Sequence, residues 1–219
     1  MKRVVTVLLA LCLLISLAPN VFAQESAPSN LPPMKKYSEE QYDKEDILAL
    51  EKYVSVKDGY FVLDSSKAKS DGFKNDLVDG QQKYFEFLNS EISAGNLTVD
   101  KNLNITGQTQ EQKNFKPADA EILKCKGKTT KSKTYWWGYS RKLNSCDSKK
   151  VATSFSSASS VAAGIAVAAA WFGIIPSVPP GLSAAYFGLV ASRINANNNG
   201  KGVIADMTWA VVFNIKPQK

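Results

Sequence analysis

The sequence predicts an α+β fold, and three observations lead to this prediction. The 219 residues are 44% apolar and 21% charged, which is the composition of a folded globular protein. The dipeptide Asp58-Gly59 separates two short apolar runs, a pattern typical of a β-hairpin. Between Phe73 and Ile92, apolar side chains recur at the spacing of one helix face. We therefore expect a small helix and short-strand N-terminal half, followed by a C-terminal half with a disulfide-closed Trp-rich β-hairpin and an apolar Ala/Gly helical hairpin.

The chain begins with the pattern of a secretory signal peptide. Lys2 and Arg3 precede an apolar run over residues 4–18, and Val21-Phe22-Ala23 forms a small-x-small cleavage site. The apolar run has about 15 residues, whereas a membrane-spanning helix needs about 20. We therefore expect a secreted, extracellular protein that is cleaved after Ala23.

The N-terminal half is predicted to alternate helices with strand pairs. The expected elements are a helix of about 15 residues after the capping box Ser38-Glu39-Glu40-Gln41, a hairpin of 54–56 with 60–63, a helix over 73–92, and strands at 97–99 and 103–105. The expected organisation is a signal peptide at 1–23, a flexible lead-in at 24–36, an acidic α+β domain at 37–106, a linker at 107–120, and a basic and apolar domain at 121–219 with the helical hairpin at 156–194.

Cysteine usage predicts one disulfide. Cys12 lies in the signal peptide, so cleavage leaves Cys125 and Cys146. An even number of cysteines in an exported protein favours a bridge, which would close a loop of about 20 residues and contribute roughly 3 kcal/mol. The alternative is two free thiols.

Charge is divided unequally between the two halves. Residues 24–119 carry 12 Lys against 17 Asp plus Glu, whereas residues 120–219 carry 13 Lys plus Arg against 3 acidic residues. The imbalance indicates that the two halves have different surroundings or different partners.

A basic segment with aromatic residues at its centre opens the C-terminal half. Nine Lys or Arg lie between Lys124 and Lys150, around Tyr135-Trp136-Trp137-Gly138-Tyr139. Aromatic residues between cations are typical of nucleic-acid surfaces or of membrane interfaces, and export argues against nucleic acid. The alternative is a β-hairpin strand with Trp136 buried, which is compatible with an interfacial role.

An uncharged stretch of 42 residues follows, over 151–192, and its Pro-Gly cluster at 176–181 predicts two helices. A helix over 156–175 would be about 30 Å long and long enough to span a membrane, whereas one over 182–194 would reach only about 20 Å. The stretch is either buried core or an element that inserts into a target membrane. Strands are then expected at 203–204 and 209–215, the last of them pairing with the Trp-rich strand.

The sequence offers no basis for catalysis. It contains no histidine, which excludes the Ser/His/Asp triad, the Cys/His pair and His-ligated metal sites. Ser66-x-x-Lys69 has the spacing of a serine-lysine hydrolase motif without its companion motifs. We therefore expect no enzyme, no catalytic residue, no cofactor and no metal.

Charge and aromatic content instead select candidate membrane-binding residues. They are Lys126, Lys128, Lys131, Lys133, Tyr135, Trp136, Trp137, Tyr139, Arg141, Lys142, Trp171 and Phe172. The expected partners are an anionic membrane surface or cell-wall polymer, together with an immunity protein or receptor, and no nucleic acid. The acidic half is expected to cover the apolar stretch until the protein reaches a membrane or is cleaved within 107–120.

Over residues 37–215 these features resemble secreted proteins of Bacillus-type Gram-positive bacteria, some of which are described as large bacteriocin-like antimicrobials. The resemblance rests on the signal peptide, the acidic half, the Tyr-Trp-Trp-Gly-Tyr segment, the uncharged Ala/Gly stretch and the Trp-bearing terminal strand. It implies an antimicrobial or envelope role and supplies no catalytic residues. A passive envelope-binding or structural protein is the alternative.

Overall fold

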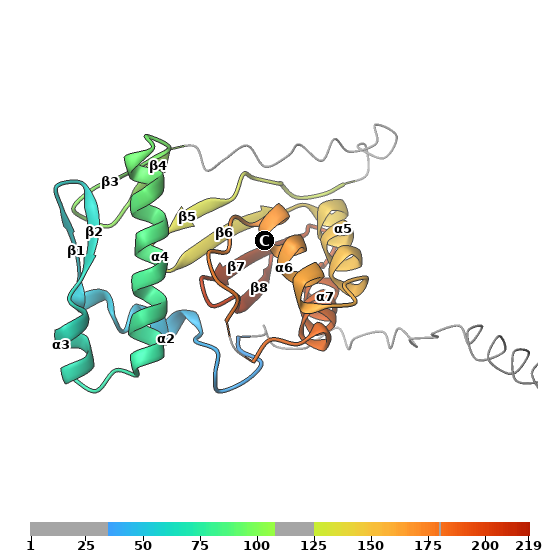
Figure 1. Cartoon of the computed structure of the whole chain (residues 1–219). Coiled ribbons are helices and arrows are strands. Elements are labelled where there is room, and N and C mark those ends of the chain that lie inside the picture. Colours follow the sequence, from blue (N-terminus) through green and yellow to red (C-terminus); the bar gives the residue numbers. More distant parts are fainter. Residues whose placement is uncertain (1–34, 108–124, 180) are drawn as a thin grey trace, which may run out of the picture.

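A computed structural model describes residues 35–107, 125–179 and 181–219 of the chain (Figure 1). The fold mixes helices and strands, as the α+β class predicts. The predicted signal peptide, most of the lead-in and most of the linker lie outside the described residues. The elements of the first part are α2 (Lys44–Leu48), the 3-10 turn η2 (Glu51–Tyr53), β1 (Val54–Lys57), β2 (Tyr60–Leu63), α3 (Ser65–Ser70), α4 (Asn75–Ser93), β3 (Leu97–Val99) and β4 (Ile105–Gly107). Those of the second part are β5 (Lys133–Tyr135), β6 (Gly138–Leu143), α5 (Ser145–Ser156), α6 (Val161–Trp171), α7 (Ala184–Asn197), β7 (Val203–Thr208) and β8 (Phe213–Pro217).

The β1–β2 hairpin and α4 form where the sequence predicts them. Asp58 and Gly59 have φ values of 52° and 82°, which is the all-positive geometry of a two-residue turn that follows the strand twist. The Asn89 amide of α4 bonds to both backbone groups of Phe61 in β2, at 2.8 and 2.9 Å. The hairpin is therefore fastened to the helix by a side chain as well as by apolar packing.

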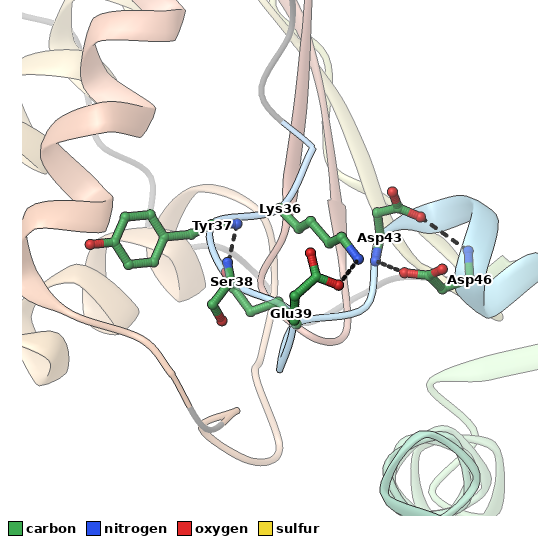
Figure 2. Close-up of polar contacts among 7 residues, drawn as sticks. Lys36, Tyr37, Ser38, Glu39, Asp43 and Asp46 are labelled. Atoms are coloured by element: carbon green, nitrogen blue, oxygen red, sulfur yellow. Dashed lines mark hydrogen bonds and ion pairs between the residues drawn. The ribbon is translucent and has the colours of Figure 1, made fainter. Parts of the chain in front are cut away.

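The predicted first helix is wrong in both position and length. The helix in this region is α2, five residues long, and its capping box is formed by Asp43 and Asp46 (Figure 2). The Gln41 Oε1 atom accepts hydrogen bonds from the backbone N–H groups of Tyr37 and Ser38, and so closes a turn. Gln41 is completely buried. Its packing under the turn therefore overrides the capping pattern that the sequence displays.

The second part is built on an antiparallel sheet in the order β5-β6-β7-β8. The helices α5 to α7 lie between β6 and β7 in the sequence and cover one face of the sheet. On this face the Phe213 ring of β8 packs against the rings of Phe155 and Phe172, with ring centroids 5.5 and 5.2 Å apart. Of the predicted strand 209–215, the Trp209 N–H donates to the Trp137 carbonyl at 3.2 Å, but β8 does not pair with the Trp-rich hairpin, because β7 lies between β6 and β8.

The Trp-Trp dipeptide forms a turn where a strand is expected. Trp136 and Trp137 join β5 to β6, and the strand resumes at Gly138. A Cβ atom on Gly138 would lie 2.2 Å from the carbonyl oxygen of Met207 in β7. The backbones of β6 and β7 therefore approach so closely here that the position after the turn requires glycine.

The uncharged stretch holds shorter helices than predicted. Asn144 caps α5, a helix that the sequence analysis missed, and α6 spans 11 residues in place of the 20 expected over 156–175. The partner of α7 is chiefly α5, not α6. Within residues 35–107, 125–179 and 181–219, no helix combines the length and apolar character that crossing a membrane requires.

A buried polar contact joins the two parts. The Gln81 amide of α4 donates to the Trp136 carbonyl at 3.0 Å and accepts from the Trp209 indole N–H at 2.8 Å. The Tyr84 hydroxyl donates to the Tyr135 carbonyl at 2.9 Å. Figure 1 shows the sheet between α4 and the helices α5 to α7. Buried side chains from both parts belong to a single hydrophobic cluster.

Candidate functional site

Exposed lysines from separate segments meet where β6 ends, β7 begins and β8 ends. We call this surface the basic end, and its members are Lys126, Lys128, Lys142, Lys201, Lys216 and Lys219. In the sheet register, Lys142 and Lys216 both align with Ile204, one from each side, so that the three side chains share one face. The Gly127 Cα lies against the carbonyl of Lys201, since an added Cβ would stand 1.7 Å from that oxygen.

Gln218 fixes the backbone of the basic end. Its Nε2 atom donates to the carbonyls of Lys128, Leu143 and Val203 at 3.0, 2.8 and 3.2 Å, and its Oε1 atom accepts from the N–H of Lys128. The Cys125–Cys146 disulfide, with Cα atoms 5.4 Å apart, ties the same segment to the first turn of α5. The predicted bridge is therefore confirmed, and the lysines project from a fixed frame.

We expect Gln218→Ala to lower the free energy of unfolding by about 1–2 kcal/mol, because its side chain bonds to three carbonyls and the contacts with those of Leu143 and Val203 are partly buried. Chemical denaturation measures this directly. Gln218→Glu provides a second comparison, since it retains the size of the side chain and places a carboxylate against the same three carbonyls. An unfolding energy unchanged in both variants would show that Gln218 does not hold the basic end together.

The lysines of the basic end outnumber the acidic side chains near it among the described residues. In 125–179 and 181–219 the acidic side chains are Asp147 and Asp206. Asp147 accepts a hydrogen bond from the Thr129 hydroxyl, and Asp206 lies 3.6 Å from Lys44 of α2. No basic-end lysine forms an ion pair with a described carboxylate. The surface therefore presents net positive charge to solvent.

The structure divides the predicted cationic run into two places. Lys126, Lys128 and Lys142 belong to the basic end, whereas Lys131 and Lys133 are exposed along the β5 edge. The Ser132 hydroxyl donates to the carbonyl of Phe172, which places this edge beside the end of α6.

The aromatic residues predicted to anchor in a membrane are mostly interior. Trp136, Trp137, Tyr139 and Phe172 are all buried, as the alternative prediction has it for Trp136, so none of the four is presented on the surface in this conformation. Burial raises the pKa of the Tyr139 phenol above its ordinary value, and its hydroxyl donates to the carbonyl of Ile174 at 2.7 Å. These side chains are therefore committed to the core because the turn and the helix ends pack around them.

Three further predicted residues are partly covered. Tyr135 stacks on Trp137 with ring centroids 4.8 Å apart, and the Lys44 Nζ atom lies over the Trp137 ring, 3.9 Å from its centroid. Arg141 packs over Trp171 at 5.3 Å and donates to its carbonyl, while burial lowers the pKa of the guanidinium. Arg141 and Trp171 therefore join the β6 strand to the end of α6.

Helix α6 carries an apolar side chain or glycine at every position, yet only one stripe of it is buried. Gly164 and Ala168 face inward, and Gly164 lies flat against the Phe187 ring, where a Cβ would approach to 2.1 Å. The opposite stripe of Ala162, Ala166 and Ala170 is exposed. We call this stripe, together with exposed Ile174, the α6 ridge. An uncharged helix of this kind is ordinarily buried on all sides.

Sequence reasoning missed Lys201, Lys216 and Lys219. They lie outside the cationic run, and only the pairing of β7 with β6 and β8 brings them to it. Among the described residues, no group of three or more His, Cys, Asp or Glu side chains is arranged to hold a metal ion.

The described residues thus combine cations on a fixed backbone at one end of the sheet with an exposed apolar stripe on α6, whose end lies beside the β5 edge. Comparison with known proteins adds no relative to this description. No protein-family model, no curated protein and no solved structure matches the chain.

Proposed function

We propose that the protein is a secreted, cationic, bacteriocin-like antimicrobial that acts at the membranes of target bacteria. The observation that carries the proposal is the α6 ridge, an uncharged exposed helix stripe whose end lies beside the cationic β5 edge. Lysines near an anionic bilayer each contribute about 1 kcal/mol to binding, and an apolar helix face adds its burial at the interface.

The role of the aromatic residues in this proposal follows from their burial. First contact is made by exposed lysines and the α6 ridge, because Trp136, Trp137 and Phe172 are inside the fold. A helix of 11 residues is about 16 Å long, so α6 lies in the interface and does not span the bilayer.

The N-terminal part acts as a holder in this proposal. Gln81 of α4 donates a hydrogen bond to Trp136 in the turn between β5 and β6. The Tyr37 ring contacts Tyr186 of α7, with ring centroids 5.5 Å apart. Release of the aromatic residues to a membrane would require these contacts to break, by undocking or by cleavage in the predicted linker 107–120.

Dye leakage from vesicles tests the proposal. We expect the secreted protein to release dye from phosphatidylglycerol-containing vesicles and to leave purely zwitterionic vesicles intact. Replacing Ala162, Ala166 and Ala170 with Glu should reduce leakage by about tenfold or more, because three carboxylates then occupy the face that enters the interface. These positions are exposed, so the fold should persist.

The matched control adds the same charge elsewhere on the helices. Thr153, Ser156 and Ser159 are exposed on or just after α5, and their triple Glu variant should leak vesicles nearly as well as the parent. Equal leakage by both variants would contradict a role for the α6 ridge. A parent protein that binds isolated cell walls and leaks no vesicle would favour the passive envelope alternative.

A further inference from the structure

We propose that the basic end is a docking surface for a linear phosphate polymer that carries no bases, of the kind found in bacterial cell walls. This binding is separate from the membrane activity proposed above, and it uses a different part of the molecule. The basic end surrounds Gln218, whereas the α6 ridge follows the exposed stripe of Ala162, Ala166 and Ala170.

The first step of the argument is the spacing of the cations. Lys142 and Lys216 lie on either side of Ile204 on the same sheet face, two strand spacings apart, which corresponds to about 10 Å between their backbones. Lys126, Lys128 and Lys201 continue the charge around the end of the sheet. A row of separated positive charges fits a chain of separated negative charges better than it fits one small anion.

The second step is the rigidity of the frame. The disulfide and the four hydrogen bonds of Gln218 hold the backbone from which the lysines project. The Thr130 hydroxyl also accepts a hydrogen bond from a backbone N–H of β6, and the Thr129 hydroxyl accepts one from the N–H of Asn144. Lysines on a fixed backbone lose less conformational entropy on binding than lysines on a flexible tail. The Lys ammonium is a compact point charge, suited to successive phosphodiesters that each accept one contact.

The described surface of the basic end also differs from a surface that binds nucleic acid or inserts into a bilayer. The large hydrophobic side chains exposed on the described surface are Tyr37, Tyr60, Ile174, Val178 and Leu189, and none belongs to the segments of the basic end. A surface for single-stranded nucleic acid combines its cations with aromatic faces on which bases stack. A bilayer-inserting surface requires exposed apolar residues. The basic end therefore favours a phosphate chain that has neither bases nor a lipid interior.

Long-chain inorganic polyphosphate is the probe for this inference, used with the full secreted protein at about 0.1 M salt. We expect the triple variant Lys142→Gln, Lys201→Gln and Lys216→Gln to bind polyphosphate at least about tenfold more weakly, and the slope of log K against log salt to fall by about two. The triple Arg variant at the same positions should retain binding, which separates lost charge from lost structure.

The control removes the same net charge from the other part of the molecule. Lys57, Lys74 and Lys101 are exposed there, and their triple Gln variant should bind polyphosphate within about twofold of the parent. An equal loss in both Gln variants would overturn the inference, because binding would then depend on net charge alone.

Two further measurements distinguish the competing partners. Single-stranded DNA that binds as tightly as polyphosphate, through the same three lysines, would overturn the assignment in favour of nucleic acid. Lost binding to phosphatidylglycerol vesicles with unchanged polyphosphate binding would reassign the basic end to lipid. If the protein leaks vesicles but does not bind polyphosphate, this inference is overturned and the proposed function stands. If it binds polyphosphate but leaks no vesicle, the proposed function is overturned and this inference stands.

Discussion

The Gln81→Leu variant is expected to lose about 3 kcal/mol of unfolding free energy, because the substitution leaves two buried groups without partners. These groups are the Trp136 carbonyl and the Trp209 indole N–H, which bond to the Gln81 amide at 3.0 and 2.8 Å. Gln81 is completely buried, so water cannot replace the lost bonds. Leucine has a similar size, and the loss therefore reports the polar contacts more than the volume.

The neighbouring Gln82→Leu is the matched control for this variant. Gln82 is only half-buried, and its one hydrogen bond, to the Ser65 hydroxyl, is long at 3.4 Å. We expect it to change the unfolding free energy by less than about 0.5 kcal/mol. Urea unfolding followed by tryptophan fluorescence measures both variants. Similar small losses in the two would contradict a structural role for the Gln81 bridge between the halves.

Removal of the disulfide should have an effect of comparable size. The double variant Cys125→Ser and Cys146→Ser opens a bridge across a sequence separation of 21 residues, for which loop-closure entropy gives about 3 kcal/mol. The released segment is the one that carries Lys126 and Lys128, so the basic end should loosen before the rest of the fold.

Reduction of the parent protein provides the comparison for the double variant. Thermal unfolding of the parent in reducing buffer should match that of the variant, and reducing buffer should leave the variant unchanged. A parent protein whose unfolding temperature does not move on reduction would show that the bridge adds no stability. In that case the hydrogen bonds of Gln218, Thr129 and Thr130 suffice to hold the segment.

The elements that local sequence controls were predictable. The β1–β2 hairpin depends on Asp58-Gly59, and α4 depends on the spacing of its own apolar residues. The Cys125–Cys146 bridge followed from cysteine number. The ends of α6 were not predictable, because a helix of alanine, glycine and valine shows no periodic contrast between faces and so gives no sign of where it stops.

The remaining errors come from contacts between distant segments. The capping box at Ser38 was overridden because Gln41 is buried beneath its turn, and the carbonyls of the Trp-Trp turn bond to the distant residues Gln81 and Trp209. The basic end was only half visible, since Lys201 and Lys216 join it through the pairing of β7 with β6, whose partners lie 60 to 70 residues apart in sequence, and of β8 with β7. Sequence proximity identified the cationic run, and only topology identified its surface.

The long reach of the buried polar contacts also governs the order in which the chain can fold. Tyr42 and Gln81 form hydrogen bonds with Thr208 and Trp209, which follow them by 166 and 128 positions in the sequence. Lys128 likewise bonds to Gln218. During synthesis, α4 is complete while the groups it must satisfy do not yet exist. Contacts between residues so far apart in sequence make folding slower than in proteins that are held together by local contacts. The buried contact between the two parts can therefore form only after Trp209 has been added, and the Gln218 contacts only after residue 218.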